Sequence, residues 1–250
     1  MRVSPTKLAT FQRCPQQYAF QYVQRIPRAP TAAMTFGSNL HRTLQTLYEQ
    51  GGPQTETAEQ VKARLQASWS GHGFASPTEE AAYKALGETI VSQFHGQYQI
   101  EEGTPLLIEK RLEAPYEDVR FFGIVDRVDL MPDATLNVID YKSTRYIATD
   151  VSEVNDELMQ QLSLYAYMAK VHLPYPVRRL SIHYLRTNER LSFPPEAMGE
   201  GWLERAYAAA QAMVAAHETE RFPAQLGDHC RWCPYTSRCR AYRAHTHPVL

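Results

Sequence analysis

The sequence lacks the features that would tie a protein to a membrane or to secretion. Its 250 residues contain no apolar run near 18 residues long, so we expect no transmembrane helix. The first residues, MRVSPTKLATFQRC, lack the apolar core of a signal peptide. We therefore expect a cytoplasmic protein. The net charge of −1 gives no overall attraction to nucleic acid, so any such binding must come from a local patch.

Cysteine is scarce, and its spacing is informative. The four cysteines are Cys14, Cys230, Cys233 and Cys239. Disulfides are a poor first interpretation in a cytoplasmic chain. A C-x2-C pair with a third cysteine six residues on is typical of metal ligation, and Cys14 is the candidate fourth ligand. Such a site holds either zinc or an iron–sulfur cluster, and spacing alone does not separate them. Either metal would join the first helix to the C-terminal tail.

Apolar residues (44%) suit a globular protein with a sizeable core, and no internal repeat or clear linker interrupts the chain. We interpret residues 1–250 as one domain. Strands and helices alternate after a hairpin, which predicts an α/β fold with a mixed sheet flanked by helices. The expected helices cover residues 37–48, 57–69, 78–98, 157–170 and 195–217; the expected strands cover 106–112, two segments of 121–144, and 177–186. We expect a loop at 26–35.

The stretch FFGIVDRVDLMPDATLNVIDYKST, residues 121–144, contains the most distinctive chemistry. It predicts two short strands joined by a turn at 131–135. Side chains alternate along a strand, so Asp140 and Lys142 share a face, and Asp126 can meet them from the neighbouring strand. This arrangement predicts a site for a hard divalent cation. The alternative is a surface salt bridge between Asp140 and Lys142, worth about 0–1 kcal/mol.

Such a site suits phosphodiester hydrolysis. A divalent ion held by Asp126 and Asp140 would activate water and relieve charge on the phosphate. Lys142 could position the water, help to deprotonate it or offset charge in the transition state. Tyr141 faces the other side of the strand, towards the core. The spacing of three puts Asp129 on the face opposite Asp126 in a regular strand.

Several further residues could belong to a functional site. His41 lies beside the apolar face of its helix, either as a packed edge residue or as a site residue. Glu109 either reaches the metal patch or faces solvent. Gln161 and Tyr165 are four apart and so share one helix face. The arginines of the tail either contact phosphates or form a solvated face.

Taken in their order along the chain, these residues resemble the motifs of a known family. Gly37-x3-His41, Gly123-x-x-Asp126, Asp140-Tyr141-Lys142 and Gln161-x3-Tyr165 resemble the RecB-type nucleases of the PD-(D/E)xK superfamily. The cysteine pattern resembles their iron–sulfur subgroup, which includes the AddB nuclease domain and the RecB-like CRISPR-associated exonucleases. The resemblance extends from about Ser4 to Arg240.

The resemblance implies a restriction-endonuclease-like catalytic core at 105–190, a helical region at 36–100 as an insert, and a cluster module of Cys14 plus 227–240. It implies Mg²⁺ or Mn²⁺ bound by His41, Asp126, Asp140 and the backbone carbonyl of Tyr141. Lys142 would be catalytic together with Asp126 and Asp140. Gln161 and Tyr165 would contact DNA or support Lys142. Cys14, Cys230, Cys233 and Cys239 would hold a [4Fe–4S] cluster rather than zinc.

The implied activity is that of a metal-dependent deoxyribonuclease, an exonuclease on single-stranded DNA ends. It would act in DNA repair and recombination or in CRISPR adaptation, with a helicase or an adaptation protein as partner. No G-x4-G-K-[ST] motif occurs, so the chain is not a whole helicase–nuclease. The alternative is a non-catalytic DNA-binding or assembly subunit with a structural four-cysteine metal site. The intact acidic and lysine positions disfavour it.

Overall fold

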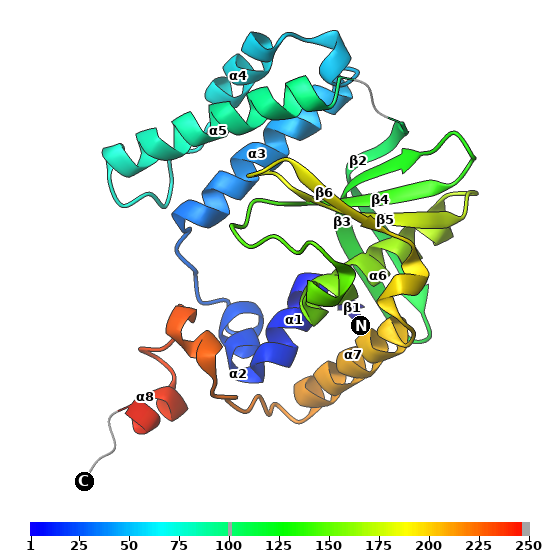
Figure 1. Ribbon diagram of the computed structural model, residues 1–250. Coiled ribbons are helices and arrows are strands. Elements are labelled where there is room, and N and C mark those ends of the chain that lie inside the picture. The colour runs from blue at the N-terminus through cyan, green and yellow to red at the C-terminus, as the bar shows by residue number, and fades with distance from the viewer. Residues whose placement is uncertain (100–101, 247–250) are drawn as a thin grey trace. The chain divides into compact units, whose positions relative to one another are not determined.

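The computed structural model describes residues 1–99 and 102–246. It divides into two compact units, each assembled from separate parts of the chain. Unit 1 comprises Met1–Ala29, Glu113–Phe122 and Gly201–Leu250, and unit 2 comprises Pro30–Leu112 and Gly123–Glu200. The chain combines helices with a mixed sheet (Figure 1), and the predicted α/β class with a mixed, helix-flanked sheet is confirmed. The single domain over residues 1–250 stays a prediction.

The sheet of unit 2 is mixed. Strand β4 (Leu136–Lys142) pairs antiparallel with β3 (Val119–Leu130) and parallel with β5 (Val177–Tyr184). Two further strands extend the sheet: β6 (Glu189–Phe193) pairs with β5, and β2 (Thr104–Tyr116) pairs with β3. The sequence did not predict β6, and β2 is longer than expected.

The predicted turn between β3 and β4 is confirmed. Met131 N–H donates to the carbonyl of Thr135 at 2.8 Å, and Ala134 N–H donates to the carbonyl of Met131 at 3.0 Å. Asp133 Oδ1 accepts from both the backbone and the hydroxyl of Thr135, which is the local bonding that favours aspartate in turns. This turn fixes the register of the two strands that carry the acidic residues.

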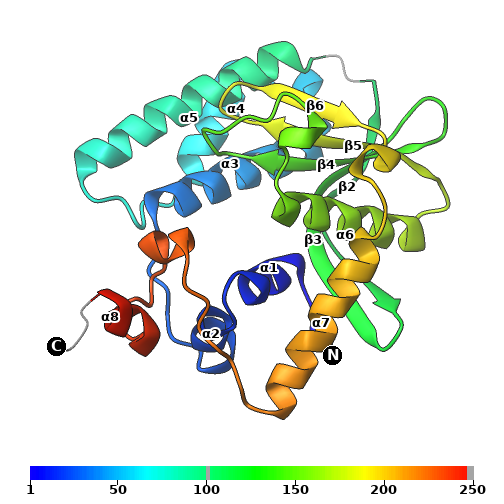
Figure 2. The same ribbon diagram turned by 60° about the horizontal axis from the view of Figure 1, so that its bottom comes forward.

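Helices cover both faces of this sheet (Figures 1 and 2). Helix α6 (Asp156–His172) packs against β4 and β5. Helices α3 (Ala32–Glu49), α4 (Ala58–Ala67) and α5 (Pro77–Gln97) pack against one another and share a buried core with Ile139 and Tyr141 of β4. Because side chains alternate along β4, Tyr141 enters the helical core while Asp140 and Lys142 lie on the α6 side, as predicted.

Two expected boundaries were wrong. The predicted loop at 26–35 ends early, because Thr31 caps α3 by accepting from Met34 N–H at 3.3 Å, and the helix begins at Ala32. The predicted helix at 195–217 is interrupted, because Gly199 and Gly201 adopt φ values of 75° and 82°. A short 3-10 turn at Pro195–Met198 precedes them, and α7 begins only at Trp202 and ends at Glu218.

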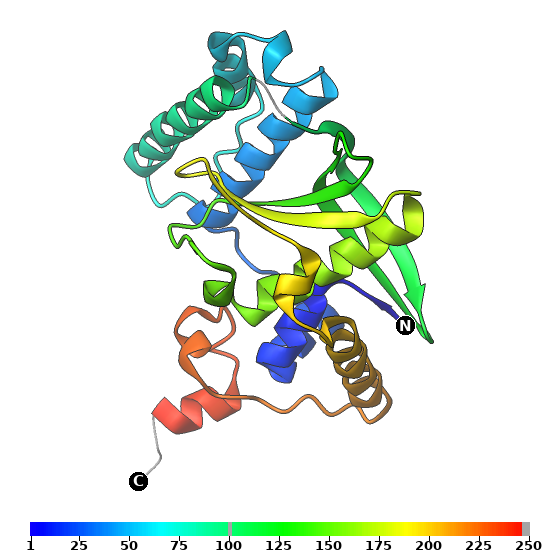
Figure 3. The same cartoon turned by 45° about the vertical axis from the view of Figure 1, so that its right-hand side comes forward.

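Unit 1 combines the N-terminal segment of the chain with the segment that follows Gly201 (Figure 3). Helix α1 (Pro5–Arg13) is capped by Ser4, which accepts from Lys7 N–H, and it packs against α7. Cys14 lies at the break between α1 and α2 (Pro15–Tyr18). The remaining elements of unit 1 are β1 (Arg2–Val3), which pairs with Arg120 and Phe121, a π-helical turn at Ala19–Val23, a 3-10 turn at Asp228–Trp232, and α8 (Arg240–Thr246).

Within the described residues, no helix combines the length and apolarity needed to cross a membrane. Further 3-10 turns of unit 2 lie at Pro53–Thr55 and Val151–Glu153.

Candidate active site

Side chains from three elements of unit 2 converge on one point. The ligand atoms of His41 on α3, Glu109 on β2 and Asp126 on β3 all lie within 4.8 Å of one another. His41 Nδ1 is 3.0 Å from Glu109 Oε1 and 3.6 Å from Asp126 Oδ1. His41 Nε2 is 3.2 Å from the carbonyl oxygen of Tyr141. The cluster therefore combines imidazole, carboxylate and carbonyl donors, a set that suits a divalent cation.

Glu109 joins this cluster through an unusual backbone conformation. Its φ of 44° is left-handed, which is uncommon for a residue other than glycine. Such a conformation costs about 1–3 kcal/mol, and residues that carry it concentrate at functional sites. Of the two interpretations left open for Glu109, the structure supports the metal patch. A charged residue inside a strand was the only signal in the sequence.

Asp140 and Lys142 form a buried pair beside this cluster. The Arg127↔Ile139 register places Asp126 next to Asp140, and Tyr141 N–H donates to Asp126 Oδ2 at 2.7 Å. Lys142 Nζ is 2.7 Å from Asp140 Oδ2. The Asp140 side chain is only 1% exposed, so the surface salt bridge considered from the sequence is not what forms here. Despite the close lysine, neither Asp140 oxygen makes a hydrogen bond of regular geometry to any described residue.

The predicted Gln161–Tyr165 pair extends this network. Lys142 Nζ donates to Gln161 Oε1 at 3.2 Å, and Gln161 Nε2 donates to the Tyr165 hydroxyl at 2.9 Å. Tyr165 is buried against the sheet. Gln161 therefore orients the lysine, and Tyr165 orients Gln161.

The two glycines of the predicted motifs permit close approach. A Cβ on Gly123 would lie 2.8 Å from Tyr165 Cε1, and one on Gly37 would lie 2.9 Å from Ser143 Oγ. A side chain at Gly123 would push α6, and with it Gln161, away from the sheet.

The acidic groups interact strongly with His41. Burial by itself would lower the pKa of His41, but Asp126, Glu109 and Asp140 outweigh it and raise this pKa to about 9. Burial raises the pKa of Asp126 to about 7; His41 opposes the rise, and Asp140 and Glu109 add to it. A cation bound here would replace these protons as the partner of the acids.

Without metal, we expect the melting temperature to fall as the pH rises from about 6.5 to about 9. The raised pKa of His41 means that its proton stabilises the fold below pH 6.5, and that this contribution is lost as the pH passes through about 9. Asp126 contributes in the same direction: the folded state binds its proton more tightly than the unfolded state does, and this stabilisation is lost as the pH rises to about 7. Thermal unfolding in chelator tests this. In the His41→Gln variant the melting temperature should no longer fall above pH 7. A wild-type melting temperature that is equally constant above pH 7 would contradict the prediction.

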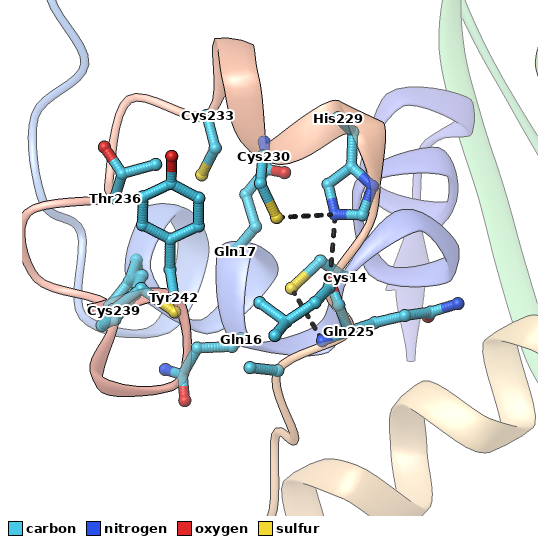
Figure 4. A pocket seen from close by; sticks show the side chains of 13 residues that line it. Cys14, Gln16, Gln17, Gln225, His229, Cys230, Cys233, Thr236, Cys239 and Tyr242 are labelled. Atoms are coloured by element: carbon cyan, nitrogen blue, oxygen red, sulfur yellow. Dashed lines mark hydrogen bonds between the residues drawn. The ribbon is translucent and has the colours of Figure 1, made fainter. Parts of the chain in front are cut away.

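The four cysteines gather in unit 1. All of them line one small pocket, and their sulfurs face one another across it (Figure 4). Cys14 Sγ accepts a backbone hydrogen bond from Gln225 at 3.4 Å. Burial raises the pKa of the Cys233 thiol, and the proximity of the other three cysteines adds to the rise. The pattern in the sequence thus corresponds to a spatial cluster of thiols.

The mixed sheet, with acidic residues and a lysine on adjacent strands, places the chain in the class of α/β proteins with a restriction-endonuclease-like core. A family model of the PD-(D/E)XK nuclease superfamily matches residues 2–240, and the chain belongs to this superfamily. No curated protein matches the sequence.

A solved structure shares the fold. The crystal structure of a protein from Eubacterium rectale, named "putative exonuclease", matches with a TM-score of 0.60 and 10% identity, covering 99% of this chain and 88% of that chain. The structure of SSO0001 matches with a TM-score of 0.45 and 12% identity, covering 96% of this chain and 86% of that chain.

Proposed function

We propose that this protein is a Mg²⁺- or Mn²⁺-dependent deoxyribonuclease. The observation that carries the proposal is the convergence of His41, Glu109 and Asp126 beside Asp140 and Lys142. Membership of a nuclease superfamily supports hydrolysis of a nucleic acid. The name of the Eubacterium rectale protein supports an exonuclease. We propose single-stranded DNA ends as the substrate, in repair, recombination or CRISPR adaptation, alongside a helicase or adaptation partner.

The residues present fit a divalent cation. Asp140 is buried; its Oδ2 pairs with Lys142 at 2.7 Å, but its Oδ1 has no hydrogen-bond donor among the described residues, which leaves that oxygen for a cation. Asp126, Asp140, His41 and the Tyr141 carbonyl would hold the ion, with Glu109 at hand. When bound, the ion would activate a water molecule and relieve charge on the phosphate. Lys142 supplies a second positive charge at the same place.

Digestion of end-labelled single-stranded DNA tests the proposal. Protein purified without oxygen is mixed with a 5′- or 3′-labelled oligonucleotide and Mg²⁺ or Mn²⁺, and Asp140→Asn serves as the matched control. We expect loss of label that requires metal and is absent in the variant, and the label lost first gives the polarity. If protein that shows the visible absorbance of an iron–sulfur cluster does not cleave DNA, the non-catalytic DNA-binding subunit is favoured instead.

We further propose that the four cysteines hold a [4Fe–4S] cluster, as in the AddB-like iron–sulfur subgroup. Two observations support this: all four thiols line one pocket, and their spacing in the sequence resembles that of this subgroup. Thiolate ligands suit such a cluster chemically.

The Cys233→Ala variant should lose the cluster and loosen the tail. The pocket links Cys14, at the end of α1, to the segment 230–239, so removal of one ligand removes the connection. We expect loss of visible absorbance, rapid proteolysis between α7 and α8, and weaker DNA binding. Thr236→Ala is the matched control, because Thr236 lines the same pocket without a thiol. Unchanged proteolysis and unchanged DNA affinity in Cys233→Ala would count against the proposal.

A further inference from the structure

Helix α3 carries a stripe of polar side chains that leads away from the metal cluster. Ser38, His41, Arg42 and Gln45 follow the i, i+3, i+4, i+7 spacing and so share one helix face. Together with Glu109 they line an open pocket of about 360 Å³. Two of these residues, His41 and Glu109, belong to the metal cluster itself. Whatever fills the pocket therefore lies next to the reacting phosphate.

Arg42 is held in place at this pocket. Its Nη1 donates to the carbonyl oxygen of Ser68 at 2.7 Å, which fixes the side chain and leaves its other N–H donors available. No carboxylate of the described residues pairs with Arg42, whereas Arg64, Arg127 and Arg179 of the same unit each contact an Asp or Glu. A fixed, exposed guanidinium without an acidic partner is a ready site for an anion.

We propose that this pocket is a subsite for the nucleotide that adjoins the cleaved phosphodiester, and that Arg42 binds the phosphate of that nucleotide. The inference rests on the proposed nuclease function and extends it to substrate binding. One helical turn, an axial distance of about 6 Å, separates His41 from Gln45, so the stripe can follow the strand beyond the reacting phosphate.

The lining favours the sugar–phosphate backbone over a base. The pocket has no phenylalanine, tyrosine or tryptophan on which a base could stack. It offers instead a guanidinium, the Ser38 hydroxyl and the Gln45 amide, groups that commonly contact phosphate and sugar. Backbone contacts of this kind hold a strand in register without reading its sequence. The subsite would thus position any sequence for cleavage.

Salt-dependent binding of a fluorescent single-stranded oligonucleotide tests the subsite. The parent is Lys142→Ala with Mg²⁺, chosen to prevent cleavage during the titration. Arg42→Gln removes the charge but keeps an amide that can still donate to the Ser68 carbonyl. Arg178→Gln is the matched control, because Arg178 is an exposed arginine of the same unit outside the pocket.

Arg42→Gln should weaken binding by about tenfold at low salt, as expected for a lost hydrogen bond to a charged group. The slope of log K against log salt should become less steep by about 0.7, the value for one phosphate of a single strand. Arg178→Gln should change neither quantity. An unchanged slope in Arg42→Gln, an equal change in Arg178→Gln, or no DNA binding by the parent would overturn the inference.

Oligonucleotides with a 5′-phosphate, a 3′-phosphate or neither identify the phosphate that Arg42 binds. If it is terminal, Arg42→Gln loses the preference for one phosphorylated end; if it is internal, all three oligonucleotides lose affinity equally. The nuclease proposal is judged separately, by cleavage in the wild type. A parent whose binding depends on Arg42 while the wild type never cleaves DNA would keep the subsite and reject the nuclease.

Discussion

Replacing Lys142 by alanine is expected to lower the rate of DNA cleavage by about a thousandfold while leaving the divalent ion bound. Lys142 Nζ lies 2.7 Å from Asp140 Oδ2 and donates to Gln161 Oε1. Burial by itself would lower the pKa of Lys142, but Asp140 outweighs it and the pKa is raised. The side chain is therefore a cation at neutral pH. A cation suits the proposed role of offsetting the negative charge that develops on the phosphate, rather than that of accepting a proton.

Two measurements separate this role from metal binding. Calorimetric titration with Mn²⁺ should give similar affinities for the wild type and Lys142→Ala, but a large loss for Asp140→Asn, which alters a proposed metal ligand. Single-turnover digestion should be strongly slowed in both variants. Gln161→Ala, which only removes the orienting contact to the lysine, should cleave more slowly than the wild type but faster than Lys142→Ala. Wild-type cleavage by Lys142→Ala would reject the assigned role.

The sequence predicted those parts of the site that depend on local rules. Period-two alternation placed Asp140 and Lys142 on one face and Tyr141 on the other, and the turn at 131–135 set the register that brings Asp126 beside Asp140. Helical spacing likewise placed Gln161 and Tyr165 together. The confirmed parts of the fold follow from the same periodicities.

Features that depend on distant contacts or on irregular backbone were not predictable in this way. Glu109 itself has a left-handed backbone conformation inside β2, which regular alternation of side chains along a strand does not predict. The interruption before α7 depends on two glycines that propensity alone does not distinguish from glycines within a helix. The pairing of Arg127 with Asp129 was not predicted either, because a buried arginine is unexpected in a strand.

The ion pair between Arg127 and Asp129 explains why Asp129 is absent from the metal site. Both side chains are buried on the face opposite Asp126, as the spacing of three predicts for Asp129. Arg127 Nε and Nη2 each donate to Asp129 at 2.6 Å, and Arg127 Cζ lies 3.9 Å from the ring centroid of Tyr48. The arginine also interacts electrostatically with the hydroxyl group of Tyr141, whose backbone contacts His41 and Asp126. The pair therefore lies directly beneath the candidate active site.

Asp129→Ala is expected to destabilise the fold by about 3–5 kcal/mol, because it leaves the guanidinium of Arg127 buried without its counter-charge. Denaturant unfolding measures the change, and Asp133→Ala on the exposed turn should cost far less. The double variant Arg127→Met/Asp129→Leu should regain most of the lost stability, because it removes both charges and keeps the space filled. If the pair also holds Tyr141 in position, the double variant will fold yet bind Mn²⁺ more weakly than the wild type. A stable Asp129→Ala variant would show that Arg127 finds another partner in the core and that the ion pair is not needed to support the candidate active site.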